Sequence, residues 1–557
     1  MNKLSQEPSL YLRQHQNNPV NWLTLRDNPF ELAKSEHKPV FISIGYSSCH
    51  WCHVMSRETF DNEQVANILN NDFISVKVDR EEYPDIDKKY QFYIQLLGKN
   101  GGWPLSVFTD DDGIPFFAGT YFPPNESYGI PGFIDILNQI SNFYKNDKGK
   151  LKGVKEGYFN ILIEQKKIDN FETLNIKAFA EGIDKLLDMA NGGLKGTTKF
   201  PNIPTIIALT KENFYHNKKT QDFLNLTASK LCTSGIFDHI NGGFFRYCID
   251  ESWFVPHFEK MLYDNALNVS FLSKMYELTN NKTYLHTAEM TLDFLMDDFF
   301  TEHGFISSMN AESEDFEGNS SEGFYYKINE NDLKILDESE LIFISEKIYL
   351  KNNVINIQTN DYKDILKTHT ILTKLNKTKK APDKDYKIII SWNSLLVIAM
   401  LDYFGVSADD FYFNAALNLF GKLKQHFDGA NLFRIRYNDT LFEHSCLEDY
   451  SYLLAATQKV FEITKDVKLK AFAKQLIEAA NKLFFKDGLL YFDKNHSVFD
   501  TFDEAIYSAF GLYVINTVYF SKFIDLNVDI KTLKLIAFDR FNKFPLAHPT
   551  LLNLQNY

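Results

Sequence analysis

The chain has 557 residues, 44% of them hydrophobic and 24% charged, which is the balance of a soluble globular protein with two or three domains. Its net charge of −14 argues against the concentrated basic face that nucleic-acid binding requires. The start has no apolar signal-peptide run, and no apolar stretch reaches membrane-spanning length. Five cysteines in so long a chain do not form a disulfide framework. We therefore expect a cytoplasmic protein with neither nucleic-acid nor membrane partners.

Residues 1–165 alternate strand-like and helix-like runs. β-branched and aromatic residues predict strands over 39–45 and 72–79, and "WPLSVFTDDDGIPFFAGTYF" predicts two more strands joined by an Asp-Asp-Gly turn. Amphipathic spacing predicts the intervening helices, which are expected over 49–60, 62–71, 84–97 and 132–144. This order is typical of an α/β domain.

Residues 166–557 read as a succession of amphipathic helices in pairs. Short strand-like pieces, "GFYYKI" and "LLYFD", fall only in the loops. Paired helices suit a helical toroid or a solenoid, but no fixed-period repeat is visible, so we predict an all-α toroid with a site at one mouth. The helices are expected over 176–189, 222–236, 261–278, 284–299, 392–404, 408–427, 447–463, 468–484 and 503–518.

The stretch "YSSCHWCHVM" holds a Cys-x-x-Cys, Cys49 and Cys52, followed by His53. Such a string can be a redox dithiol, half of a zinc site or a c-type haem attachment sequence. Haem attachment needs an export signal, which the start lacks, and structural zinc needs a second ligand pair. The remaining cysteines stand singly and are expected to be small core residues. We expect no metal and no cofactor.

The position of the dithiol favours redox chemistry. It follows a predicted strand and opens a predicted helix, so the helix dipole and free N–H groups would favour the Cys49 thiolate. Cys49 is then the attacking and Cys52 the resolving residue, and His50 adds a further stabilising charge. In "GGWPLSVF" we predict a cis bond between Trp103 and Pro104, facing the sulfurs. The alternative is a thioredoxin-like shell whose thiols do not turn over. The expected supporting residues are His50, Trp51, His53, Trp103 and Pro104.

Several long motifs resemble one known family. These are "NPVNWLTLRDNPFELAKSEHKPVFISIGYSSCHWCHVMSRETF", "VKVDREEYPDIDKKY", "GGWPLSVFTDDDGIPFFAGTYFPP", "GIFDHINGGFFRYCIDESWFVPHFEKMLYDNA", "KFPN", "SWNSLL" and "LEDYSYL". Together they span residues 18 to about 454 and resemble the YyaL-type, spermatogenesis-associated protein family. The resemblance implies a thioredoxin-like domain (1–165) fused to a six-hairpin glycosidase-like (α/α)6 barrel (166–557), similar to N-acylglucosamine epimerases.

The chain departs from the family pattern in three places. Asn310-Ala311-Glu312-Ser313 stands where the family has an Asp-Ala-Asp-Ser loop. "DEAIYSAF" replaces the Pro-Ser-Gly-Asn signal of the last hairpin, and the end after "LAHPTLLNLQNY" is short.

A second constellation runs from Asp238 to Asp264. We expect Pro256 near a helix start, with His257, Glu259 and Asp264 in its first turns, pointing into the barrel cavity. Carboxylates, histidines and aromatic faces together are typical of carbohydrate sites. Two carboxyl groups would serve glycoside hydrolysis, and a histidine base would serve epimerisation. The expected pocket residues are His239, Arg246, Trp253, His257, Glu259, Asp264, Trp392, Asn393, Glu448, Asp449 and Tyr450.

Three functions remain open at this point. The first is a thiol–disulfide module fused to a carbohydrate-binding barrel, with a protein thiol partner and a saccharide-like ligand. The second is a sugar epimerase or glycoside hydrolase in which the dithiol is regulatory. The third is a binding protein without catalysis, in which Glu448, Asp449 and Tyr450 cap and brace helices and His257 is a satisfied buried histidine.

Overall fold

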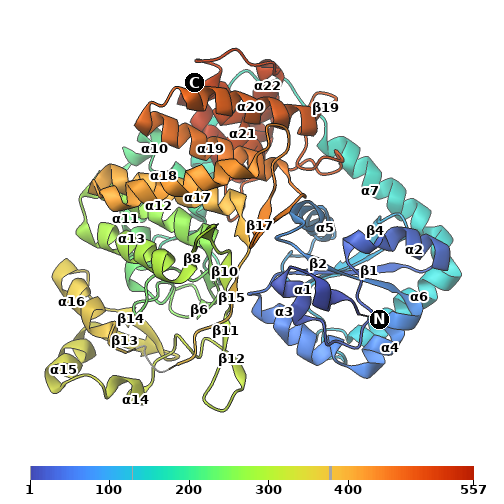
Figure 1. Cartoon of the computed structure of the whole chain (residues 1–557), viewed down its shortest axis with the longest axis horizontal. Coiled ribbons are helices and arrows are strands. Elements are labelled where there is room, and N and C mark those ends of the chain that lie inside the picture. The colour runs from blue at the N-terminus through green and yellow to red at the C-terminus, as the bar shows by residue number, and fades with distance from the viewer. Residues whose placement is uncertain (1, 128, 376–378, 557) are drawn as a thin grey trace. The chain divides into compact units, whose positions relative to one another are not determined.

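A computed structural model describes residues 2–127, 129–375 and 379–556 (Figure 1). The chain divides into two compact units, Met1–Lys167 and Ile168–Tyr557. The first has a thioredoxin-like α/β fold and the second is an (α/α)6 barrel.

The first unit is built on a four-stranded sheet of order β2-β1-β3-β4. β1 (Val40–Gly45) pairs in parallel with β2 (Ile74–Asp79), because α3 (His50–Met55) and α4 (Glu63–Asp72) form the crossover between them. β3 (Leu105–Thr109) and β4 (Pro115–Gly119) complete the sheet as an antiparallel hairpin, as the Asp-Asp-Gly turn predicts.

Both faces of this sheet are covered, which is why β1 and β2 are buried at every position. Val40, Ile42 and Ile44 pack on the side of α2 (Pro29–Glu36), α5 (Pro84–Leu96) and α7 (Leu151–Gln165). On the other face Phe41 contacts Phe108 and, from α6 (Phe133–Asp147), Phe133, with ring centroids 4.9 and 5.3 Å away. The alternation of strand residues thus decides which helix each side chain meets.

The second unit closes a ring of six inner elements. α12 packs on α17, α17 on α19, α19 on α21, α21 on η8, η8 on α9, and α9 on α12. The inner elements are α9 (Ile203–Ala208), α12 (Leu262–Thr279), α17 (Ile390–Ser407), α19 (Leu447–Thr464), α21 (Ala509–Phe520) and η8 (Pro549–Asn556). The outer helices are α8 (Ile176–Leu186), α11 (Lys218–Thr233), α13 (Lys282–Phe294), α18 (Asp410–Leu423), α20 (Lys468–Phe484) and α22 (Ile530–Lys543).

The inner helices are apolar around most of their circumference because they are enclosed on all sides. By length and composition alone, one helix among the described residues, α17, could cross a membrane, and 67% of that stretch is buried inside the structure.

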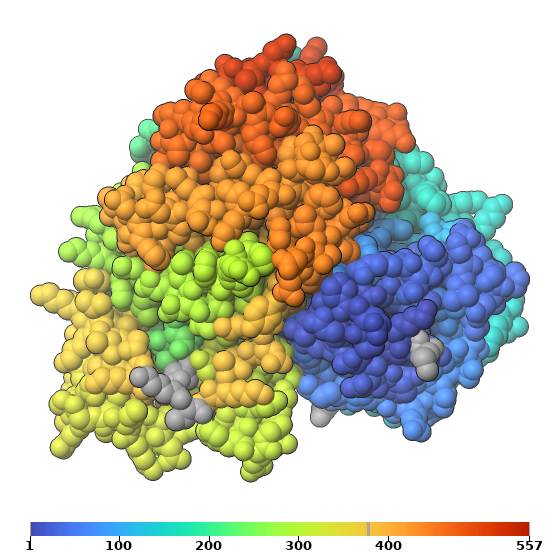
Figure 2. All heavy atoms as spheres, in the orientation of Figure 1, coloured from blue at the N-terminus to red at the C-terminus, as the bar shows by residue number. Residues whose placement is uncertain are grey.

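The sequence patterns did not predict a module inserted between α13 and α17, nor did they predict α9, α22 and η8. The inserted module contains α14 (Glu330–Leu333), α15 (Glu338–Lys347), the hairpin β13 (Ile348–Lys351) and β14 (Val354–Ile357), and α16 (Tyr362–Leu372). Its isoleucines and leucines form a small core of their own, including Ile344, Ile355 and Ile365. In Figure 2 the module is the yellow lobe below the orange helices.

Three local expectations were wrong. The helix expected at Pro256 begins at Leu262, because Pro256–His257 (β6) pairs with Tyr247–Cys248 (β5) and Lys260–Met261 (β7) pairs with Ser308–Met309 (β10). "GFYYKI" forms a turn instead of a strand, and in this turn the Tyr326 N–H donates to the Gly323 carbonyl. The last predicted helix begins at residue 509 instead of 503, because Ser508 Oγ caps it by accepting from Gly511 N–H.

Candidate functional site

The dithiol lies where the buried strand β1 passes into helix α3, as its sequence position predicts. Cys49 is the N-cap of α3, and Cys49 and Cys52 form a disulfide with their Cα atoms 5.3 Å apart. The backbone N–H of Cys52 donates to Cys49 Sγ over 3.2 Å. That hydrogen bond and the helix dipole both favour negative charge on the Cys49 sulfur once the disulfide is reduced.

The side chains between and after the cysteines differ in exposure. Cys49 and Cys52 are only 3% and 2% exposed, whereas Trp51 is 45% exposed and packs against Tyr121 with ring centroids 5.2 Å apart. His50 and His53 are half-buried. His53 Nε2 lies 2.8 Å from the Ser47 carbonyl oxygen, so Nε2 carries the proton and the ring is fixed against the dithiol loop.

The bond between Trp103 and Pro104 is cis, which confirms the prediction. Leu105 is paired with Ile44 across β3 and β1, and Pro104 directly precedes Leu105. The cis bond therefore lies beside Gly45, at the end of β1 from which the dithiol loop leaves. Trp103 Nε1 donates to Asp87 Oδ1 over 2.9 Å. The Arg80 guanidinium stacks 3.8 Å above the Trp103 ring centre and lies 3.4 Å from Asp87 Oδ2. Helix α5 thereby holds the cis-proline loop in place.

Three polar side chains, Tyr11, Ser43 and Lys77, are buried next to Gly45 behind the disulfide. Sequence analysis missed this cluster. A Cβ on Gly45 would stand 2.5 Å from Tyr11 Oη and 2.7 Å from Cys52 Sγ, so only glycine leaves room for both. Lys77 is 1% exposed, and its Nζ donates to Ser43 Oγ over 3.0 Å. Burial lowers the pKa of Lys77 well below its ordinary value and raises that of Tyr11, so it disfavours the charged form of both side chains.

In the second unit, five of the eleven residues expected at the pocket lie in ion pairs, which are Arg246, His257, Glu259, Glu448 and Asp449. Arg246 Nη1 is 3.2 Å from Glu259 Oε1, with both side chains buried. His257 Nδ1 is 2.5 Å from Glu322 Oε1 on β12 (Ser320–Glu322), and its ring lies 4.8 Å from that of Tyr247. Asp264 is buried in the first turn of α12. A carboxylate against an imidazole is an arrangement that suits a base.

A second buried group lies at the start of α19. Arg434, which sequence analysis did not single out, places Nη1 3.0 Å from Glu448 Oε1 and 2.7 Å from Asp449 Oδ1. Ser391 Oγ donates to Glu448 over 2.9 Å. Burial, against the charge of Arg434, raises the pKa of Asp449 to about 6. Tyr450 Oη accepts from Leu432 N–H over 2.9 Å.

The remaining expected pocket residues have defined structural contacts. Trp253 is fully buried and donates to the Asn191 carbonyl over 3.0 Å. Asn393 accepts from Phe305 N–H and donates to the carbonyls of Phe305 and Ile389. Trp392 meets Tyr263 edge-on, 4.8 Å between ring centres.

His239 lies in a row of three imidazoles. His239 Nδ1 is 3.1 Å from His369 Nε2, and His369 Nδ1 is 3.1 Å from His286 Nε2. His239 Nε2 lies 3.1 Å from the Ser234 carbonyl, so this nitrogen carries the proton and donates to it. In the neutral rings, His239 Nδ1 then accepts from His369 Nε2, and His369 Nδ1 accepts from His286 Nε2. Burial lowers the pKa of His239 to about 4 and that of His369 well below its usual value.

Two loops share the same hydrogen-bonded turn. In the sequence it appears as a repeated "DxxNGG", which the sequence analysis missed. In each, a buried lysine bridges the aspartate and the first glycine carbonyl: Lys199 Nζ is 2.7 Å from Asp188 Oδ2, and Lys260 Nζ is 2.7 Å from Asp238 Oδ2. The glycines Gly192 and Gly242 have φ of 75° and 80°. Asp238 is therefore a loop-building residue.

Among the described residues of the first unit, one group of carboxylates has metal-like spacing, the turn Asp110-Asp111-Asp112. Lys155 pairs with Asp110, and Lys148 Nζ lies 3.0 Å from Asp111 Oδ2, so the turn already has its counterions. The single cysteines Cys232, Cys248 and Cys446 are buried and form no disulfide, and burial raises the pKa of Cys232 to about 12, as suits an unreactive core residue.

Comparisons with known proteins bear on both units. The family model described as "Thioredox_DsbH: Protein of unknown function, DUF255" matches residues 1–162. Spermatogenesis-associated protein 20 of Homo sapiens is 31% identical over 552 residues, covering 87% of this chain and 70% of that protein. The protein of the same name from Rattus norvegicus is 35% identical over 327 residues, covering 56% of this chain and 41% of its own.

Two solved structures resemble parts of the chain. A sugar epimerase from a ruminal bacterium is 13% identical and covers 68% of this chain and 84% of its own, with a TM-score of 0.43. A structure described as "DsbH Oxidoreductase" is 18% identical and covers 23% of this chain and 85% of its own, with a TM-score of 0.18.

Proposed function

We propose thiol–disulfide exchange at Cys49 and Cys52 as the function of the first unit of this chain, which belongs to the spermatogenesis-associated protein 20 family. The observation that carries the proposal is the disulfide at the N-terminus of α3, beside a cis-proline. Its partner is a protein that carries a disulfide or a pair of thiols.

In the reducing direction the Cys49 thiolate attacks one sulfur of the partner's disulfide, and the partner's other sulfur leaves as a thiolate. Cys52 then loses its proton and attacks Cys49 Sγ, which expels the partner's first sulfur and forms the Cys49–Cys52 bond. Two electrons pass from the dithiol to the partner. The reverse sequence oxidises a partner dithiol.

Three features of the structure support this proposal. The Cys52 N–H and the helix dipole stabilise the Cys49 thiolate. The exposed Trp51 gives a partner an apolar surface next to otherwise enclosed sulfurs. Gly45 lets Cys52 Sγ sit directly over the strand, close to the Tyr11 hydroxyl, in a fixed position one helical turn from Cys49.

A redox titration of the full chain against glutathione tests the proposal, together with insulin reduction. We expect a two-electron couple that disappears in Cys49→Ser, and a Cys52→Ser variant that accumulates a mixed disulfide. Cys232→Ala, which removes a buried thiol elsewhere, is the matched control and should titrate like the wild type. A chain that shows no titrating couple would rule out the proposal.

A second candidate, saccharide turnover in the barrel, is favoured by the buried contact of His257 with Glu322. Together with the first proposal it would give a redox-regulated role in sugar metabolism. Turnover of a saccharide that is lost in His257→Ala and kept in Cys49→Ser would support it. Absence of both activities would leave a binding protein without catalysis.

A further inference from the structure

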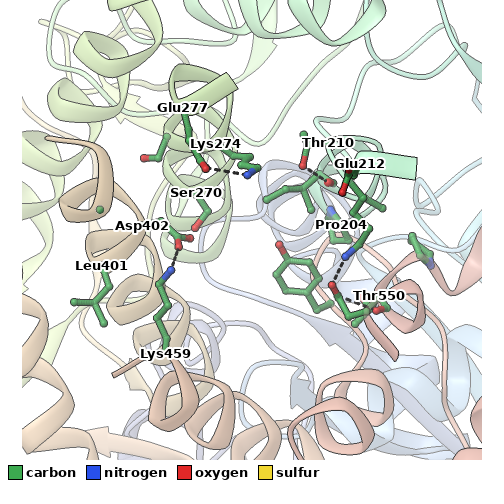
Figure 3. Close-up of a pocket in the computed structure, with 18 of the residues that line it drawn as sticks. Pro204, Thr210, Glu212, Ser270, Lys274, Glu277, Leu401, Asp402, Lys459 and Thr550 are labelled. Carbon is green, nitrogen blue, oxygen red and sulfur yellow. Dashed lines mark hydrogen bonds and ion pairs between the residues drawn. The ribbon is translucent and has the colours of Figure 1, made fainter. Parts of the chain in front are cut away.

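A cavity of about 820 Å³ lies inside the ring of the second unit (Figure 3). All six inner elements line it, and its main charged walls come from the second half of α12, the second half of α17 and the second half of α19. None of the residues that the sequence singled out for the barrel pocket is part of its wall. Its size suits a ligand the size of a sugar.

Lys211 brings a cation without a counterion to this cavity. It is half-buried, and its ammonium contacts the side-chain oxygen of Asn553. Among the described residues no carboxylate lies within ion-pairing distance of its amine. Burial and the nearby charge of Lys274 lower the pKa of Lys211. A partly buried ammonium that has a second cation for a neighbour is unfavourable until an anion joins it.

The wall carries three lysines and three carboxylates, but none of these carboxylates lies within ion-pairing distance of the Lys211 amine. Glu212 is exposed, and its Oε1 lies 3.4 Å from His216 Nε2. Figure 3 shows the ion pair of Lys459 with Asp402, whose charged atoms are 2.5 Å apart, and the two charges offset each other. Lys274 has one partner, Glu277, 2.9 Å away on the same helix face, and both side chains are at least a third exposed. Exposed pairs of this kind are weak, so Lys274 can turn to a ligand at little cost.

The wall also carries groups that hydrogen-bond hydroxyls. Ser270 and Ser273 line the cavity from α12, and Ser273 Oγ is buried without a hydrogen-bond partner among the described residues. Asp402 and Glu277 are acceptors for hydroxyl groups. A ligand that satisfies the whole wall therefore needs one anionic group and several hydroxyls.

We propose that this cavity binds a small anionic polyol, a phosphorylated or carboxylated sugar, with its anionic group between the amines of Lys211 and Lys274. Its hydroxyls then meet Asp402, Glu277 and the serines of α12. The site is separate from the Cys49–Cys52 chemistry, so failure of one proposal leaves the other intact.

Isothermal titration of the full chain, at constant ionic strength, tests the site with four probes. Glucose 6-phosphate and gluconate present the two anion types on a polyol, inorganic phosphate presents the anion alone, and glucose presents the polyol alone. We expect a dissociation constant below about 1 mM for at least one anionic sugar, and binding at least tenfold weaker for inorganic phosphate and for glucose. Equal binding of phosphate and the anionic sugars would overturn the assignment to a polyol.

Two variants and a matched control locate the binding. Lys211→Met and Lys274→Ala should each weaken binding at least tenfold, whereas Lys218→Ala removes an exposed lysine paired with Asp222 outside the cavity and should leave binding unchanged. Because Lys211→Met removes a half-buried charge that has no ion-pair partner, its Tm without ligand should equal or exceed the wild-type Tm, while the ligand-induced rise in Tm disappears. Unchanged affinity in Lys274→Ala, or equal losses in all three variants, would refute the site.

Discussion

Replacing Lys77 with methionine should change how the stability of the first unit depends on pH. The Lys77 amine is enclosed between Ser43 Oγ and the rings of Tyr11, Trp22 and Phe60, whose centres lie 5.2, 4.9 and 4.4 Å away. Burial lowers its pKa well below the ordinary value. Lys77→Met keeps a side chain of similar length and removes the titrating group.

The number of protons bound in the folded and unfolded states decides whether stability rises or falls with pH. Between the lowered pKa of the folded state and about 10.4 in the unfolded chain, the unfolded state holds the extra proton, so the free energy of unfolding rises with pH. Inside that window the slope approaches about 1.4 kcal/mol per pH unit for one group. Lys77→Met lacks this term, so the stability of the wild type should rise relative to that of the variant as the pH is raised from about 7.5 to about 9.5.

Hydrogen exchange of β1 peptides in the full, oxidised chain measures the free energy of opening of the first unit, after correction for intrinsic exchange. Keeping the disulfide closed prevents the cysteines from titrating. Lys38→Met, which removes a more exposed lysine paired with Glu36 at 2.7 Å, is the control and should follow the wild-type slope. Parallel profiles for wild type and Lys77→Met would show that the amine stays charged in the fold, and the reasoning would fail.

Three other substitutions probe the two units. Gly45→Ala puts a methyl group 2.5–2.7 Å from Tyr11 Oη and Cys52 Sγ. It should lower the stability measured by urea unfolding by about 1–3 kcal/mol and should slow thiol exchange. Unchanged stability and exchange would contradict this packing. Because the pKa of His239 is lowered to about 4, the imidazole row stabilises the fold fully above pH 6.5 and loses this as pH falls towards 4. His369→Gln keeps a donor and an acceptor without titrating, so hydrogen exchange of α16 should become less sensitive to acid; an unchanged profile would exclude the row as its cause. Arg434→Met leaves two carboxylates buried and should cost about 3–5 kcal/mol in urea unfolding, and a loss below 1 kcal/mol would show that water reaches them.

The dithiol and its supporting loop could be predicted from sequence because their determinants are local. A strand, an N-capping cysteine and a Trp-Pro before the next strand each have a sequence signature. The buried cluster behind them has none. In "ISVKVD" the alternation suggests that Ser75, Lys77 and Asp79 face solvent, yet helices cover both faces of the sheet and all three are buried. Burial of a strand's polar face depends on distant segments that no pattern within the strand reports.

In the barrel, the periodicity predicted most of the long helices but not α22. The other errors fall where pairing between distant segments decides the structure. His257 lies in a two-residue strand because Tyr247 pairs with it, and so short a ladder leaves no trace in the sequence. Arg434 could not be connected with Glu448 because the link is made by side chains converging from different elements. The repeated "DxxNGG" was available as a signal, since two glycines at positive φ after an asparagine are a strong turn marker.

Lys77 and Lys211 are both lysines with a lowered pKa, but their surroundings lead to different conclusions about their roles. Burial lowers the pKa of both, and for neither amine do the described residues include a carboxylate at ion-pairing distance. Lys77 is packed by three rings and a hydroxyl, so its desolvation favours the neutral amine. Lys211 faces a cavity of about 820 Å³ beside a second lysine, so an anion can enter and restore the charge. The volume next to the amine, and not the size of its pKa shift, decides between a neutral lysine and a binding site.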